Sequence, residues 1–163
     1  MNFEVETTRT FEEYEKYNKV VYEKLYKIKR IRIIFFVVYF LILIVLSLPK
    51  NYAEAIVVVL IAGISVFITR FITRFFVDRD IKKTYETNTL MKDAKVLYKF
   101  SEDRVESHSP IGIEVLEYSK MYKLIETDTN FYMMIAKNMG FIISKANMTK
   151  EQIEFVRGLE KKQ

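Results

Sequence analysis

The chain has 163 residues and a net charge of +5, from 26 basic and 21 acidic side chains, and half of its residues are hydrophobic. It contains no cysteine, which excludes disulfides, thiol catalysis and cysteine-ligated metals. A basic excess suits nucleic acid or an anionic lipid surface. Because much of this excess flanks two apolar runs, the composition favours lipid, and no nucleic-acid partner is expected.

The first predicted element is a short strand at Met1–Thr8. Phe3 and Val5 alternate with Glu4 and Glu6, which is the period of a half-buried strand. A single strand is not stable alone, so it needs a sheet supplied by later residues. The pattern leaves open whether this strand joins that sheet.

An amphipathic helix is predicted to follow from Phe11. Thr10 and Glu13 have the spacing of a capping box, in which each side chain caps the other's backbone. Apolar and aromatic residues then recur three and four positions apart: Tyr14, Tyr17, Val21, Leu25 and Ile28. Two alternatives remain open. The helix packs on the protein's own sheet, or it lies on a membrane surface.

Two apolar runs, Ile33–Leu48 and Ala55–Thr69, are separated by a short segment that begins with Pro49. Neither run carries a charged side chain, and both are apolar on every face, which is rare in a small soluble protein. We therefore predict a two-helix transmembrane hairpin at residues 31–78. It divides the chain into an N-terminal strand and helix (1–30), the hairpin, and a cytoplasmic part (79–163).

The second apolar run ends in a tetrad repeat, Phe67-Ile68-Thr69-Arg70 and then Phe71-Ile72-Thr73-Arg74. A four-residue step keeps equivalent side chains on one side of a helix. Five basic residues near this end are candidate contacts for anionic lipid headgroups: Arg70, Arg74, Arg79, Lys82 and Lys83. The alternative is that they only reach the membrane interface and pair locally, for example with Asp78. Basic residues outside both runs predict that both termini are cytoplasmic.

Short segments rich in β-branched and aromatic residues follow, separated by turns, and they predict an antiparallel sheet. These segments are Lys95–Phe100, Arg104–Ser107, Ile113–Leu116, Lys120–Glu126, Phe131–Ala136 and Phe141–Ile143. Thr149 and Gln152 form a second capping-box pattern, which starts a final helix. The predicted fold is an α+β membrane protein: a transmembrane hairpin plus a small antiparallel PH-like sheet closed by a C-terminal helix.

No motif indicates catalysis. His108 is the single histidine and has no second ligand or base pattern beside it, and the four glycines form no phosphate-binding loop. We expect no catalytic residues, no cofactor and no metal, and therefore a protein that is not an enzyme.

The segment Phe100–Met148 resembles the YcxB-like protein family. The resemblance rests on Leu116–Thr127, Phe131–Ile135 and Phe141–Met148. Two departures are visible: Ser144 stands where the family usually has proline, and Met148 where phenylalanine is common. The resemblance implies a bacterial inner-membrane protein with a PH-like cytoplasmic module, and it implies no catalytic residues.

Two functions remain as hypotheses. In the first, the cytoplasmic module binds an unidentified protein partner or anionic lipid headgroups, through the PH-like surface. The partner-surface candidates are Lys95, Lys99, Lys120, Lys123 and Lys145, for which simple solvation is the alternative. In the second, the chain is an immunity or stress-protection protein acting against a toxin or bacteriocin. Both hypotheses leave a homo-oligomer open.

Overall fold

The computed structural model describes residues 1–25, 33–34, 36–42 and 52–159. Contacts divide the chain into two compact units. One combines Met1–Val21 with Lys82–Gln163, and the other is Tyr22–Ile81. The first unit thus contains both ends of the chain, and we call it the α+β unit.

Helix α3, Tyr52–Thr87, contains the second predicted span. It is the one helix, among the residues that the structure describes, that is long and apolar enough to cross a membrane by length and composition. None of its most apolar window is buried. The first predicted span, Ile33–Leu48, lies partly outside the described residues. Residues 33–34 and 36–42 are helical and mostly exposed. A two-helix hairpin therefore stays a prediction.

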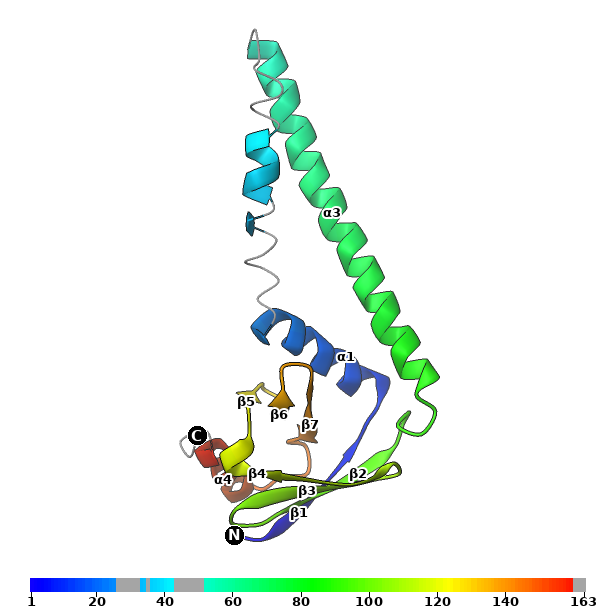
Figure 1. Ribbon diagram of the computed structural model, residues 1–163, viewed down its shortest axis with the longest axis vertical. Coiled ribbons are helices and arrows are strands. Elements are labelled where there is room, and N and C mark those ends of the chain that lie inside the picture. The colour runs from blue at the N-terminus through cyan, green and yellow to red at the C-terminus, as the bar shows by residue number, and fades with distance from the viewer. Residues whose placement is uncertain (26–32, 35, 43–51, 160–163) are drawn as a thin grey trace. The chain divides into compact units, whose positions relative to one another are not determined.

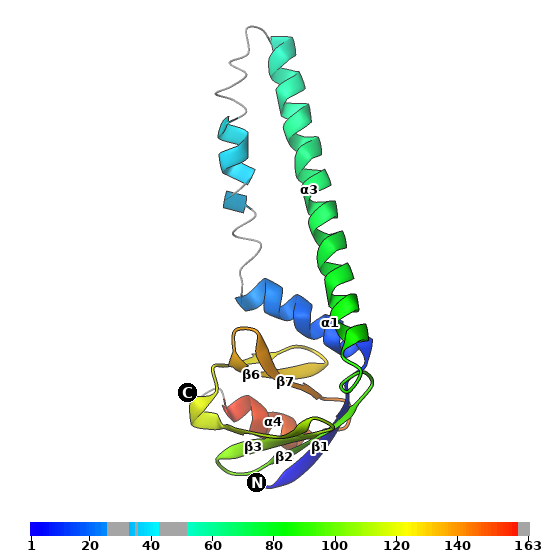
Figure 2. The same cartoon turned by 45° about the vertical axis from the view of Figure 1, so that its right-hand side comes forward.

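Two antiparallel sheets form the α+β unit (Figures 1 and 2). The four-stranded sheet has the order β1-β2-β3-β4, with β1 Phe3–Thr8, β2 Lys95–Phe100, β3 Arg104–Ser109 and β4 Gly112–Glu117. The three-stranded sheet has the order β5-β6-β7, with β5 Lys123–Glu126, β6 Asn130–Ala136 and β7 Met139–Ser144. Each predicted strand is present. The largest boundary error is at Lys120, which ends a 3-10 turn rather than starting a strand.

The N-terminal strand joins the sheet, which the sequence left open. β1 pairs with β2 over its full length, from Phe3 opposite Phe100 to Thr8 opposite Lys95. The Phe3 and Phe100 rings stack with their centroids 4.5 Å apart. Strands at opposite ends of the long insertion therefore form one sheet.

The core lies between the two sheets and helix α4, Lys150–Gly158 (Figure 2). Phe131 and Ile143 from the smaller sheet and Val105 from the larger one are fully buried together with Val156 of α4. The predicted capping box of α4 is complete, because Thr149 accepts from the Gln152 backbone and its own N–H donates to the Gln152 side chain at 2.9 Å. The closing helix is therefore confirmed.

Helix α1, Phe11–Val20, packs on the protein's own smaller sheet. Its Tyr17 is buried, and the Tyr17 and Tyr132 ring centroids lie 5.6 Å apart. This confirms the first of the two alternatives for the amphipathic helix. A π-helical turn, Val21–Leu25, follows α1. A π-helical turn has hydrogen bonds between residues five apart instead of four. This turn lies at the boundary between the two units.

Candidate functional site

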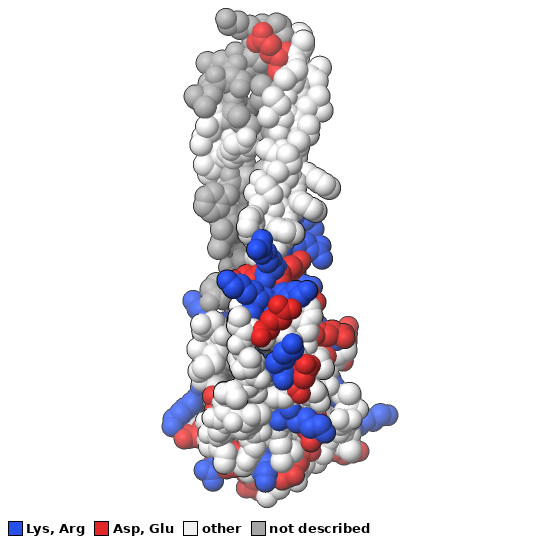
Figure 3. Space-filling model, turned by 90° about the vertical axis from the view of Figure 1, so that its right-hand side faces the viewer, with Lys and Arg blue, Asp and Glu red and all other residues white. Residues whose placement is uncertain are grey.

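The C-terminal half of α3 changes from an apolar to a basic surface. Figure 3 shows white side chains along most of the helix and Lys and Arg side chains gathered toward its C-terminal end. Phe67, Phe71 and Phe75 follow one another at four-residue steps along this helix, and all three are exposed. The Thr69 and Thr73 hydroxyls donate to backbone carbonyls four residues earlier, both at 2.7 Å. These bonds satisfy the hydroxyls inside the helix, as an apolar surrounding requires.

Only part of the basic end is paired. Arg74 lies 3.7 Å from Asp78, and Lys82 lies 3.9 Å from Glu86. Both pairs have the four-residue spacing that brings side chains together on a helix. The other three cations have no ion pair within the described part of the chain: Arg70, Arg79 and Lys83. These three side chains are the strongest candidates for an anionic group.

The exposed lysines of the sheets belong to a surface of mixed charge. Three of the five partner-surface candidates face carboxylates: Lys95 with Glu6 at 3.0 Å, Lys99 with Glu4 at 3.2 Å and Lys120 with Glu117 at 2.8 Å. Lys123 is exposed and has no ion pair with any described residue. Each of the three exposed ion pairs contributes about 0.2–1 kcal/mol to the stability of the fold. The structure therefore does not gather these lysines into one basic patch.

Lys145, the fifth partner-surface candidate, holds a structural cluster instead. Its ammonium lies 2.6 Å from the Glu126 carboxylate, donates to the Thr127 carbonyl at 2.6 Å and sits 4.5 Å from the centre of the Phe131 ring. Arg157 of α4 donates to both Glu126 oxygens, at 2.9 and 2.6 Å. The hydrogen bond from Arg157, and then the contact with Lys145, lower the pKa of Glu126 to about 2. This cluster ties α4 to β5.

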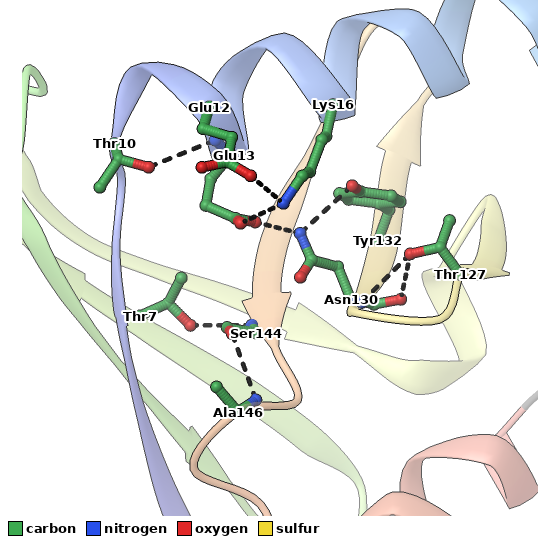
Figure 4. A network of polar contacts seen from close by, with 10 residues as sticks. All are labelled: Thr7, Thr10, Glu12, Glu13, Lys16, Thr127, Asn130, Tyr132, Ser144 and Ala146. Atoms are coloured by element: carbon green, nitrogen blue, oxygen red, sulfur yellow. Dashed lines mark hydrogen bonds and ion pairs between the residues drawn. The ribbon is translucent and has the colours of Figure 1, made fainter.

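A polar network ties α1 to the smaller sheet (Figure 4). Asn130 is fully buried, and its side-chain amide donates to the Glu13 carboxylate and to the Tyr132 hydroxyl. Lys16 lies 3.1 Å from the same Glu13. The predicted capping box of α1 is therefore only half formed. Thr10 accepts from the Glu13 backbone at 3.3 Å, but the Glu13 side chain points to Asn130 rather than back to Thr10.

The α+β unit also contains a cavity of about 220 Å³. Its walls are α1, the inner face of the larger sheet and β7 with the turn before it. Buried Tyr98 and Ser107 lie at its base, while exposed Glu114 and Asn138 lie at its rim. Burial raises the pKa of the Tyr98 hydroxyl, so that group stays protonated at neutral pH. Sequence reasoning missed this site because its residues come from five separate segments and form no local motif.

No metal or catalytic centre emerges from these groups. Within the described ranges, no group of three or more His, Asp or Glu side chains is placed to hold a metal ion. His108 lies 3.4 Å from Glu106 on β3 and does not line the cavity. The expectation that the protein is not an enzyme stays a prediction.

These features define a class: a small α+β protein of antiparallel sheets with a C-terminal helix, interrupted by a segment that contains a long apolar helix. Within it, residues 100–159 match the model of the YcxB-like protein family. The matched segment contains β3 to β7 and α4, so the resemblance seen in the sequence is confirmed. No curated protein and no solved structure gives a significant match.

Proposed function

We propose that this protein is a non-catalytic membrane protein that holds the α+β unit at the cytoplasmic face of a bacterial inner membrane. A hairpin of two spans provides the anchor, and the basic end of α3 binds anionic lipid headgroups. Both termini, which belong to the α+β unit, lie in the cytoplasm in this proposal.

The observation that carries the proposal is the unburied apolar window of α3. Burial of apolar surface stabilises by about 25 cal/mol per Å², so a helix that leaves such residues as Leu60, Ile64 and Phe67 exposed to water is strongly disfavoured. A lipid bilayer removes this cost. Since the backbone of an α-helix satisfies its own hydrogen bonds, α3 meets the second requirement of a span.

The basic end supports the lipid contact. Each lysine or arginine close to an anionic leaflet contributes about 1 kcal/mol of attraction. Arg70, Arg79 and Lys83 have no ion pair among the described residues, so such attraction competes with no internal partner. Arg74 and Lys82 each have a carboxylate neighbour and contribute less.

The sheet arrangement supports the PH-like description. The observations that support it are two antiparallel sheets, of four and three strands, and a C-terminal helix that covers the core between them.

The exposed edge of β4 favours a second candidate function, which is binding of a protein partner. β4 is the last strand of its sheet, and Ile113 and Val115 on it are exposed. Such an edge can accept a further strand. In-cell crosslinking through residues of β4 tests this candidate. The immunity hypothesis stays open and is tested by asking whether a toxin gene lies beside the gene.

Alkaline extraction tests the anchor. We expect the full chain to stay in the membrane pellet at high pH, because a spanning helix is removed only by detergent. Leu60→Arg places a charge in the middle of the window, at a cost of about 2.5–3.5 kcal/mol, and should increase the extracted fraction. Phe76→Arg, the same charge near the basic end, is the matched control. Complete extraction of the unmodified protein in buffer alone would refute the anchor.

Lipid retention tests the headgroup contact. The detergent-solubilised protein is analysed by native mass spectrometry after mixing with phosphatidylglycerol or phosphatidylcholine. We expect preferential retention of phosphatidylglycerol, and its loss in Arg70→Gln/Arg79→Gln/Lys83→Gln. The control Lys95→Gln/Lys99→Gln/Lys120→Gln removes the same number of charges from the sheet surface. An equal loss in both triple variants would show that only net charge matters.

A further inference from the structure

The cavity of the α+β unit carries two opposite charges on its lining. Arg9 lies in the loop between β1 and α1, and Glu114 lies on β4. The strand register sets Tyr98 opposite Ser107 and Ser107 opposite Glu114. Residues directly opposite each other point to the same face of a sheet, so Glu114 shares the inner face with the buried Tyr98. The cavity thus has a cationic and an anionic group above a hydroxyl-bearing base.

Neither charge has an ion pair among the residues that the structure describes. Arg9 is nevertheless well positioned. Its N–H donates to the Ala94 carbonyl at 2.8 Å, its own carbonyl lies 3.1 Å from the Tyr85 hydroxyl, and its guanidinium lies 5.1 Å from the centre of the Tyr14 ring. An arginine held by its backbone and by an aromatic face loses less freedom when it binds an anion.

Other polar groups of the lining already have partners within the unit. The Ser109 hydroxyl donates to the Gly112 carbonyl at 3.1 Å, and the Asn18 amide donates to the Tyr14 carbonyl at 2.8 Å. The Thr7 hydroxyl accepts from the Ser144 backbone at 3.0 Å. The charged groups of the lining that remain for a ligand are Arg9 and Glu114, with the amide of Asn138 beside them at the rim.

The volume limits the ligand to a small molecule. Cavities that hold drug-sized ligands measure about 300–1,000 Å³, and this one measures about 220 Å³. The Arg9 guanidinium and the Glu114 carboxylate together match a ligand that carries one negative and one positive group and therefore has no net charge. A phosphomonoester carries about −1.5 to −2 charges, so the Glu114 carboxylate would repel it. A carboxylate fits the planar fork of a single arginine.

We propose that this cavity binds a free amino acid. The Arg9 guanidinium binds the carboxylate of the ligand, and the Glu114 carboxylate binds its ammonium group. The apolar part of the lining, which includes Met139 and Phe141, contacts the ligand side chain. This site is independent of the lipid contact proposed for α3, because it lies wholly within the α+β unit.

Calorimetric titration of the full chain in detergent with each of the twenty L-amino acids tests the proposal. We expect at least one to bind, and its N-acetyl and carboxamide derivatives to bind at least tenfold more weakly, because each derivative lacks one charge. Arg9→Gln and Glu114→Gln should each weaken binding at least tenfold. The controls Arg104→Gln and Glu117→Gln remove the same charges from residues that do not line the cavity and should leave affinity unchanged.

Glu114 is exposed, so its replacement keeps the test valid even if Arg9→Gln fails to fold. Near-ultraviolet circular dichroism of the tyrosines checks the folding of each variant. Binding of none of the twenty amino acids would overturn the proposal. Binding that is unchanged in Glu114→Gln, or equally strong for the N-acetyl derivative, would overturn it as well.

Discussion

The backbone N–H of Ser144 donates a hydrogen bond to the hydroxyl of Thr7 at 3.0 Å, across 137 positions of the chain. Thr7 is buried and belongs to β1, which pairs along its other side with β2. The N-terminal strand therefore contacts both sheets of the α+β unit. Residues 22–81 are an insertion into a unit that combines residues from before and after it.

Removal of the insertion should leave a folded protein. We expect a variant that lacks residues 31–78, rejoined by a flexible linker, to unfold in one cooperative transition and to give a dispersed amide NMR spectrum. A variant that lacks residues 1–78 loses β1, exposes the edge of β2 and should not give a dispersed spectrum. If the variant that lacks residues 1–78 folded as well as the variant that lacks residues 31–78, β1 would contribute little to the stability of the α+β unit.

Asn130→Asp should destabilise the protein by about 3 kcal/mol, because it places a second carboxylate against Glu13 at a fully buried position. Adding Glu13→Gln restores one amide and one carboxylate at the contact, and much of the lost stability should return. The control Asn147→Asp makes the same change at an exposed position and should shift stability by less than about 0.5 kcal/mol. Denaturant unfolding followed by tyrosine fluorescence measures all four proteins, since the chain has no tryptophan.

The stability contributed by Glu126 should depend on pH. Its pKa is lowered from 4.5 to about 2 in the folded protein, chiefly by the hydrogen bond from Arg157 and then by Lys145. A lowered carboxyl pKa stabilises the folded state above pH 4.5, and this contribution is lost as the pH falls toward 2. The full shift corresponds to about 3.4 kcal/mol, which solvent screening of this partly exposed group reduces to about 1–2 kcal/mol.

Glu126→Gln should therefore be less stable than the unmodified protein at pH 7 by about 1–2 kcal/mol, and the difference should be clearly smaller at pH 3 and close as the pH approaches 2. Unfolding midpoints at pH 7, 5 and 3 measure this. Glu102→Gln, in an exposed turn, is the control and should show no such pH-dependent difference. A difference that stayed constant across the three pH values would assign the effect to packing rather than to charge.

The proposed topology predicts opposite labelling of two single cysteines, which the cysteine-free chain allows without other changes. A membrane-impermeant maleimide added to intact spheroplasts should label Glu54→Cys, at the start of α3, and not Glu102→Cys in the α+β unit. Permeabilisation should expose the second site, which controls for its reactivity. The positive-inside rule places the α+β unit in the cytoplasm. Labelling of Glu102→Cys in intact spheroplasts would therefore contradict the proposed orientation.

The sequence by itself determined the local structure. Apolar runs, period-two alternation and turn residues depend on nearby residues alone, and they predicted the strands, α4 and the long apolar helix. The capping box of α4 formed as its pattern predicts because the half-buried Gln152 side chain has no competing partner among the described residues.

Tertiary structure decided which polar groups are engaged, because that depends on residues brought together from distant segments. Glu13 has the same cap spacing as Gln152, yet it turns to the buried amide of Asn130. Lys145 has the sequence signature of a surface lysine, yet Glu126 and the Thr127 carbonyl bind it. The cavity that carries Arg9 and Glu114 exists only because β1, α1 and β4 meet. A buried polar group must find a partner wherever the fold supplies one, and spacing along the chain does not specify that partner.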